Sequence, residues 1–168
     1  PLLDKGVVRL DTPGLNALGT EPELTLSTLP SAHAVLFVLA ADTGVTRSDM
    51  EIWRNHVVVA VNPSKQKAIA VLNKIDTMWD DLHDESITQE NIQRQVKETA
   101  HILEMDQNMV IPVSAQKGLI AKVRNDRMLL ARSGLPTLEK ILSHDLVSAK
   151  QKLIQKKVQA GLGAMASN

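Results

Sequence analysis

The sequence predicts an α/β fold, in which a mostly parallel sheet has helices packed on both of its faces. Short apolar runs at residues 6–10, 34–40, 68–72 and 109–113 have the length and composition of buried parallel strands. Each run ends in a polar turn, and stretches with apolar residues at helical spacing separate the later runs. Because the carboxyl ends of parallel strands meet at one edge of a sheet, we expect the polar turns to gather there.

The first run stops at residues 11–14, read Asp-Thr-Pro-Gly, which is typical of a turn. Residues 15–28 mix polar residues with scattered leucines, and we expect a short helix at 23–29. The run at 34–40 is the most apolar of the chain, so it predicts a central strand that is buried on both faces.

Helix signals follow each later strand. Thr46 or Ser48 is expected to cap a helix that runs to about His56, with Trp53 packing it on the sheet; Ser48-x-x-Glu51 has the spacing of a capping box.

A second capping-box spacing, Ser86-x-x-Gln89, precedes a longer helical stretch. The buried face of that helix is expected to hold Ile92, Val96, Ala100 and Leu103. One more helix is expected at 119–131, broken at Ser133 and Gly134, and Thr137 is expected to cap the last helix.

Composition sets the broad class. With 168 residues, 43% of them apolar, the chain is one domain or most of one, and its core must be aliphatic because Phe37, Trp53 and Trp79 are its only aromatic residues. Nineteen basic and nineteen acidic residues cancel, so no general attraction to nucleic acid is expected. The absence of cysteine excludes disulfides and thiol catalysis. No apolar run reaches the ~18 residues of a membrane span, and we expect a cytoplasmic domain.

The polar turn at residues 73–76, Asn-Lys-Ile-Asp, carries the most specific chemistry. A carboxylate at Asp76 can accept two hydrogen bonds from the adjacent N–H groups on a guanine edge, a pair of donors that adenine lacks. Asn73 can add an amide contact and brace the loop, and the stem of Lys74 can lie across the plane of the base. The simpler alternative is a polar exit from a strand without a ligand.

Two other turns fit the same chemistry. Asp11 can hold Mg²⁺ through a water, and Gly14 allows a backbone N–H to approach a phosphate closely. After the run at 109–113, the small residues Ser114 and Ala115 allow backbone N–H groups to reach a guanine carbonyl oxygen. The alternatives are an ordinary turn at residue 11 and a simple helix cap at Ser114.

Asp-Thr-Pro-Gly at 11–14, Asn-Lys-Ile-Asp at 73–76 and Ser-Ala-Gln-Lys-Gly at 114–118 occur in the order of the third, fourth and fifth motifs of the GTPase superfamily. With their flanking residues, these sequences resemble those of bacterial dynamin-family large GTPases over roughly residues 1–155. The resemblance implies a three-layer, P-loop-NTPase-like GTPase fold in a protein that hydrolyses GTP and remodels membranes. It implies that Asn73, Lys74, Asp76, Ser114 and Ala115 bind guanine, Gly14 binds the γ-phosphate and Asp11 binds Mg²⁺.

One family motif is missing, because the chain contains no Gly-x-x-x-x-Gly-Lys-Ser/Thr phosphate loop. We therefore expect residues 1–155 to be a partial G domain whose sheet is incomplete at its N-terminal side. Residues 156–168 are expected to be a helix end and a frayed tail. Position 15, where many small GTPases place a catalytic Gln, is Leu15, and no catalytic residue is expected in this chain.

The family resemblance implies GTP and GDP as ligands, and self-association and peripheral membrane lipid as partners of the parent protein. It places the parent in the cytoplasm or peripherally at the inner membrane. Nucleic acid is not expected as a partner. The alternatives are a degenerate GTPase fold that serves as a non-hydrolysing interaction module, and a ribosome- or RNA-associated GTPase of the same superfamily.

Overall fold

The computed structural model describes residues 32, 34–61, 67–80 and 84–144. The chain divides into two compact units, Leu10–Leu138 and a second made of Pro1–Arg9 with Glu139–Asn168. The first unit holds the sheet, and the described part of the second, residues 139–144, is helical. The elements expected at 6–10 and 23–29, together with Asp11 and Gly14, lie outside the described residues.

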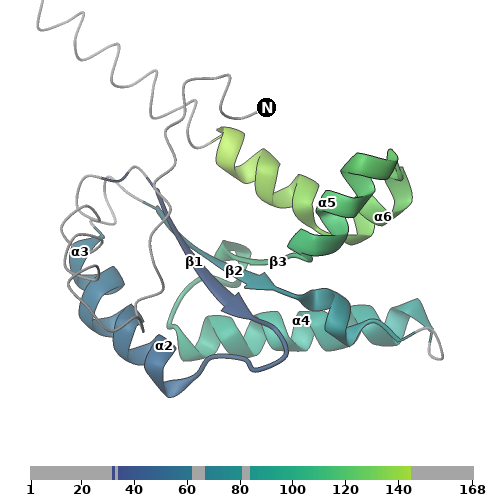
Figure 1. Cartoon of the computed structure of the whole chain (residues 1–168). Helices are drawn as coiled ribbons and strands as arrows, with labels where there is room; N and C mark the ends of the chain where they lie inside the picture. Colours follow the sequence, from purple (N-terminus) through teal and green to yellow (C-terminus); the bar gives the residue numbers. More distant parts are fainter. Residues whose placement is uncertain (1–31, 33, 62–66, 81–83, 145–168) are drawn as a thin grey trace, which may run out of the picture. The chain divides into compact units, whose positions relative to one another are not determined.

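The described strands form one parallel sheet, as the sequence predicts. β1 (Ala34–Ala40), β2 (Lys67–Asn73) and β3 (Val110–Pro112) are arranged in the order β1-β2-β3 (Figure 1). Ala40 is opposite Asn73, and Leu72 is opposite Pro112, so the three strands end side by side. The polar turns that follow them therefore begin at the same edge of the sheet.

Burial differs between the two longer strands. Ile69, Ala70 and Leu72 of β2 are fully buried, as expected for a strand with a neighbour on each side. In β1, by contrast, Leu36 is 40% and Val38 is 59% exposed. The expectation that β1 is buried on both faces is therefore wrong for the described structure, because only the face that carries Val35 and Leu39 packs into the core. Apolar composition alone does not tell the two faces of a strand apart.

A helical run of three segments follows β1: α2 (Arg47–Ile52), the π-helix η3 (Trp53–Val57) and α3 (Val58–Ala60). Of the two caps that the sequence offers, Thr46 is used. Its hydroxyl accepts from the Asp49 N–H at 3.2 Å, and the Asp49 carboxylate accepts from the Thr46 N–H at 2.9 Å. The box therefore forms two residues before the Ser48-x-x-Glu51 spacing, and the helical run extends beyond the expected end near His56.

Trp53 packs this helical run onto the sheet, as expected. Its side chain is buried, and its ring centroid lies 5.3 Å from that of Phe37 in β1. Its indole N–H donates to the Leu103 carbonyl at 3.0 Å. The Leu103 carbonyl lies at the C-terminal end of α4 (Glu85–Ile102), so one side chain joins the helical run after β1, the sheet and α4.

The helix α4 carries the expected apolar face. Ile92, Val96 and Ala100 are buried in the same core as β1, β2 and Trp53. Asp84 is its N-cap, so the expected capping box at Ser86 is wrong: Ser86 lies inside the first turn. Figure 1 shows α4 on one side of the sheet and the two helices at residues 115–132 on the other.

Two short helices replace the single one expected at 119–131. These are α5 (Ala115–Arg124) and α6 (Arg127–Arg132), separated by Asn125 in the left-handed conformation, with φ of 54°. Asp126 then caps α6, its side chain accepting from the Leu129 N–H at 3.0 Å. Asn and Asp favour such positions, so the break has a local signal.

The chain turns again after α6, where the sequence predicts a break. Residues 135–144 are helical, so Thr137 lies within this helix and the expectation that it forms the cap is wrong. A 3-10 turn, η4 (Ile75–Met78), follows β2, and another, η5 (Gln107–Met109), precedes β3. Within the described ranges, no helix combines the length and the apolar character needed to cross a membrane.

The position of Trp53 leads to a stability prediction. Trp53→Phe keeps most of the apolar contact but leaves the buried Leu103 carbonyl without its donor, so we expect the free energy of unfolding to fall by about 1–3 kcal/mol. Urea unfolding followed by circular dichroism measures this loss. As a control, Val59→Ala at a site that is 78% exposed should change it by less than about 0.5 kcal/mol. A Trp53→Phe variant as stable as the unaltered chain would show that this hydrogen bond does not anchor α4.

Candidate base-binding site

Two loops that lie far apart in the sequence meet at the carboxyl edge of the sheet. Backbone pairing continues past the strand ends: the Val113 N–H donates to the Leu72 carbonyl at 2.9 Å, and the Ile75 N–H donates to the Val113 carbonyl at 3.3 Å. This pairing brings residues 73–76 beside Ser114, as expected from the positions of the turns. Asp76 and Ser114 therefore belong to the same edge of the sheet.

Asn73 joins the two loops through a single oxygen. Its Oδ1 accepts from the Lys74 N–H at 2.8 Å and from the Ala115 N–H at 3.1 Å. A carbonyl oxygen has two lone pairs, and both are used here, so the Nδ2 group of Asn73 is left as the donor. The Ala115 N–H, which the sequence suggests as a donor to a guanine carbonyl, already has a partner in this structure.

Lys74 has an uncommon backbone conformation. Its φ of 67° and ψ of 30° lie in the left-handed region, which costs an L-residue roughly 1–2 kcal/mol. Hydrogen bonds on both sides hold it there: its N–H donates to Asn73, and the Thr77 hydroxyl donates to its carbonyl at 2.8 Å. Its ammonium lies 3.7 Å from the Asp42 carboxylate, in the turn that follows β1. The turn after β1 thus also supplies a residue, Asp42, to this edge of the sheet.

Asp76 supplies a carboxylate with free acceptor capacity. It lies in the first turn of η4 and is half-buried. Among the described residues, nothing donates a hydrogen bond to its carboxylate or forms an ion pair with it. A half-buried carboxylate loses part of its hydration. A ligand that offers two N–H groups would replace the lost hydrogen bonds to water.

Ser114 and Ala115 form the second loop. Ser114 is completely buried and is the N-cap of α5, where its Oγ accepts from the Lys117 N–H at 3.2 Å. The simple capping role that the sequence allows is therefore present. Ala115 follows as an exposed small residue, which leaves space beside the Asn73 amide.

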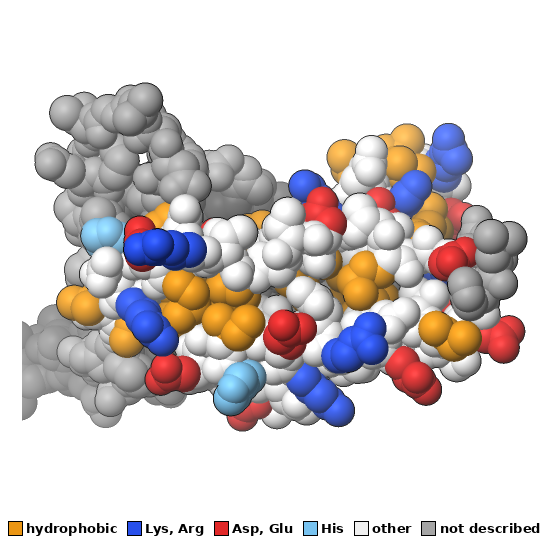
Figure 2. Space-filling model, turned by 90° about the horizontal axis from the view of Figure 1, so that it is seen from below, with side chains coloured by type: hydrophobic (Ala, Val, Ile, Leu, Met, Phe, Trp, Pro, Cys, Tyr) orange, Lys and Arg blue, Asp and Glu red, His pale blue; other side chains and the backbone are white. Residues whose placement is uncertain are grey.

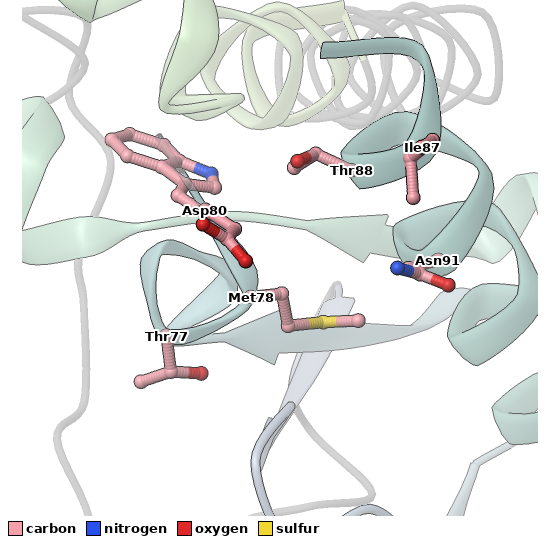
Figure 3. A pocket seen from close by; sticks show the side chains of 7 residues that line it. Thr77, Met78, Asp80, Ile87, Thr88 and Asn91 are labelled. Carbon is pink, nitrogen blue, oxygen red and sulfur yellow. The ribbon is translucent and has the colours of Figure 1, made fainter. Parts of the chain in front are cut away.

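A cavity of about 360 Å³ is separate from the candidate base-binding site (Figure 3). Its walls come from η4, the two residues after it and the start of α4: Thr77, Met78, Trp79, Asp80, Ile87, Thr88 and Asn91. None of the residues of the predicted base site lines it. Within the described part of the chain, no group of His, Asp or Glu side chains is arranged to hold a metal ion, and Asp11, the predicted Mg²⁺ residue, lies outside that part.

Two of the contacts at this edge come from residues that the sequence motifs do not contain. Asp42 pairs with Lys74, and the Ser133 carbonyl accepts from the Ser114 N–H at 2.8 Å. Asp42 opens a turn directly after a predicted strand, a position that could have suggested a role at this edge. The Ser133 contact uses a backbone oxygen, for which side-chain chemistry gives no signal.

Comparison with known proteins relates this chain to GTPases. No protein-family model matches it. The chain is 32% identical over 124 residues to a protein of Arabidopsis thaliana described as "Probable transmembrane GTPase FZO-like, chloroplastic". The match covers 73% of this chain and 12% of that protein, so the chain spans about an eighth of the relative's length.

Two solved structures of the GTPase Era are similar in fold, each at 22% sequence identity with a TM-score of 0.49, covering 80% of this chain and 38% of Era. One is Era of Aquifex aeolicus bound to GDP and AlF4⁻. The other is Era in complex with MgGDPNP and nucleotides 1506–1542 of 16S ribosomal RNA. The sequence similarity to the relative named a GTPase points to the GTPase superfamily and does not specify bacterial dynamins.

The Era complex corrects the expectation that nucleic acid is not a partner. That expectation rested on a net charge of zero, yet the structure of a GTPase with a similar fold contains ribosomal RNA. Net charge is a poor guide because phosphate contacts depend on where individual lysines and arginines lie. Figure 2 shows basic and acidic side chains interspersed on the face that α4 crosses, a distribution that a sum over the chain does not describe.

Asn73 offers a test of how the two loops are joined. Asn73→Ala removes the shared acceptor, so we expect the Ala115 and Lys74 amides to exchange with solvent about tenfold faster or more. Asn73→Asp keeps an oxygen at the same place and should preserve the protection of both amides. Hydrogen exchange followed by NMR on the nucleotide-free chain measures each amide. Equal protection of the Ala115 amide in the unaltered chain and in Asn73→Ala would contradict the bridge.

Proposed function

We propose that this chain is the guanine-reading part of a GTP-binding domain. One observation carries the proposal: the half-buried Asp76 carboxylate, without a partner among the described residues, lies at the same sheet edge as two loops joined by Asn73. The sequence similarity to a named GTPase over 73% of the chain supports it.

The chemistry of guanine fits this edge. Its N1–H and N2–H groups point in the same direction, and a carboxylate such as that of Asp76 can accept from both. Adenine presents no such pair and would leave the desolvated carboxylate unpaired. Sites built in this way reject the wrong partner by about 10⁴-fold or more. Asp76 therefore serves in the proposal as the residue that selects the base.

The neighbouring residues have supporting roles in this proposal. Asn73 offers its Nδ2 group to an acceptor on the base, while its oxygen fixes the loop. Lys74 lays its aliphatic stem against the plane of the base, and Asp42 holds its ammonium end. Ser114 holds the start of α5 in place, so that Ala115 can approach the base closely.

The phosphate side of the proposal rests on sequence alone. Gly14 would bring a backbone N–H to the γ-phosphate and Asp11 would hold Mg²⁺ through a water, as the resemblance implies. When bound, the ion would neutralise charge on the phosphate oxygens. We propose that the parent protein is a GTP hydrolase that draws its phosphate loop from outside this chain.

The finer part of the proposal is a dynamin-like, membrane-remodelling GTPase. Its support is the order of the motifs at 11–14, 73–76 and 114–118, and the relative that is named a transmembrane GTPase. Electron microscopy of vesicles incubated with the full-length protein, with and without GTP, tests it. Vesicles that keep their shape with both would remove the membrane part while leaving guanine recognition intact.

Replacing the base-selecting carboxylate should change which base is bound. In the full-length protein, Asp76→Asn replaces one acceptor oxygen by a donor, so we expect GTP affinity to fall by about 100-fold or more, while xanthosine triphosphate, which has a carbonyl oxygen in place of the amino group, gains affinity. Competition against a fluorescent guanine nucleotide measures both.

The matched control is Glu90→Gln on the exposed face of α4, the same loss of charge at a distant position, which should leave both affinities unchanged. If Asp76→Asn kept the GTP affinity and the preference of the unaltered protein, Asp76 would not be the base-selecting residue.

The chain of 168 residues on its own should bind GTP weakly and release no measurable phosphate. Phosphoryl transfer is catalysed largely by groups placed around the phosphates, and this sequence has no phosphate loop. Three missing charge-assisted hydrogen bonds would raise the dissociation constant about a thousandfold or more. Calorimetric titration with GTP and Mg²⁺, beside a phosphate-release assay, tests this, and micromolar affinity with steady turnover would refute it.

A further inference from the structure

A corner of three consecutive residues, Arg132 to Gly134, contacts Trp79, which follows the first loop of the candidate site, and Ser114 of the second loop. Arg132 is the last residue of α6, Ser133 ends that helix and Gly134 begins the next turn. Neither the motifs nor the comparisons assign these residues a role.

Arg132 contacts the first loop through Trp79. The guanidinium carbon lies 4.3 Å from the centroid of the Trp79 ring, which is within the range of a cation–π contact. Trp79 in turn is tied to the base-selecting turn, because its backbone N–H donates to the Asp76 carbonyl at 3.2 Å. The residue whose ring contacts Arg132 is thus hydrogen-bonded through its backbone to the turn that carries Asp76.

Glu85 fixes the orientation of Arg132 from the other side. The Arg132 Nε lies 3.1 Å from the Glu85 Oε1, at the start of α4. The angle of this contact does not satisfy a hydrogen bond, and the Nε is buried without another partner. We therefore regard it as an ion pair only. The Arg132 side chain is 29% exposed and that of Glu85 is 61% exposed, so only the arginine end of this pair is partly shielded from water.

Ser133 and Gly134 contact the second loop. The Ser133 carbonyl accepts from the Ser114 N–H at 2.8 Å, and both residues are completely buried. The Ser133 Oγ donates to the Leu130 carbonyl at 2.6 Å and accepts from the Leu135 N–H at 3.3 Å, which keeps the corner folded. Gly134 has a φ of +70°, and a Cβ at this position would lie 2.2 Å from the Pro112 carbonyl oxygen. The corner therefore presses against the end of β3.

We propose that Arg132, Ser133 and Gly134 position the two base-reading loops relative to each other, so that base selectivity depends on a corner that does not touch the base. This inference rests on the proposed guanine site. Arg132 holds the turn of Asp76 through Trp79, and Ser133 holds Ser114 through its carbonyl. The distance between the loops decides whether the Asp76 carboxylate reaches the amino group of guanine, and so sets the selectivity over a base that lacks this group.

The test compares GDP with inosine diphosphate, which lacks the amino group that Asp76 would accept from. In the full-length protein, Arg132→Met keeps the length of the stem but removes the planar cation. We expect the ratio of the two affinities to fall about three- to tenfold. Arg132→Lys keeps the charge but not the planar group that stacks on the ring. Its affinity ratio should therefore lie between those of the unaltered protein and Arg132→Met. Arg124→Met, at an exposed position of α5, is the matched control and should leave the ratio unchanged.

Thermal unfolding without nucleotide, measured on the same variants, separates positioning from packing. A ratio unchanged in Arg132→Met, whatever happens to the melting temperature, overturns the proposal. If Arg132→Met does not fold, Trp79→Leu removes the other half of the contact and should lower the ratio by a similar factor, while Trp79→Phe keeps an aromatic face and most of the selectivity.

The outcome for the unaltered protein distinguishes the two levels of inference. If it binds GDP and inosine diphosphate equally well, the proposed guanine site itself is wrong. If it prefers GDP and the Arg132 and Trp79 variants prefer GDP to the same degree, the site stands and only the role of the corner is refuted.

Discussion

Backbone hydrogen bonds beyond the ends of β2 and β3 hold the candidate site together. The pairs from Val113 to Leu72 and from Ile75 to Val113 extend the parallel ladder into the loops. A parallel ladder fixes register rigidly when both strands are buried, and β2 is buried along most of its length. The buried sheet thus fixes the positions of Asn73, Asp76 and Ser114. The same loop sequences placed on another scaffold would not form the site.

Much of the fold could be predicted from the sequence, because the signals were strong and local. The bounds of β1, the apolar face of α4 and the packing of Trp53 follow from the apolar pattern and from helical spacing. The errors have physical causes. The exposed face of β1 depends on which elements cover it, and an apolar run carries no information about that. A single left-handed residue at Asn125 redirects the chain between α5 and α6, and an asparagine inside a helical stretch is only a weak signal for such a break.

The site could be predicted as a set of motif residues but not as a network. Asn73, Asp76 and Ser114 are recognisable by residue type and by their place after strands. Their real partners are largely backbone groups: the Ala115 N–H, the Lys74 N–H and the Ser133 carbonyl. Every residue has these groups, so no sequence pattern marks the ones that matter. For the same reason the sequence predicts only a helix break at Gly134, although the absence of a side chain there lets the backbone approach Pro112.

The π-helical turn at Trp53–Val57 has a consequence for how this protein is compared with others. In this turn the Val58 N–H donates to the Trp53 carbonyl, five residues back instead of four, so the helical run holds one residue more than a regular α-helix with the same ends. The extra residue lies within the helical run, after the buried Trp53. A homologue that lacks this turn should therefore align with a one-residue gap inside 53–57, and an alignment that places the gap after residue 61 would mispair residues 58–61 by one position.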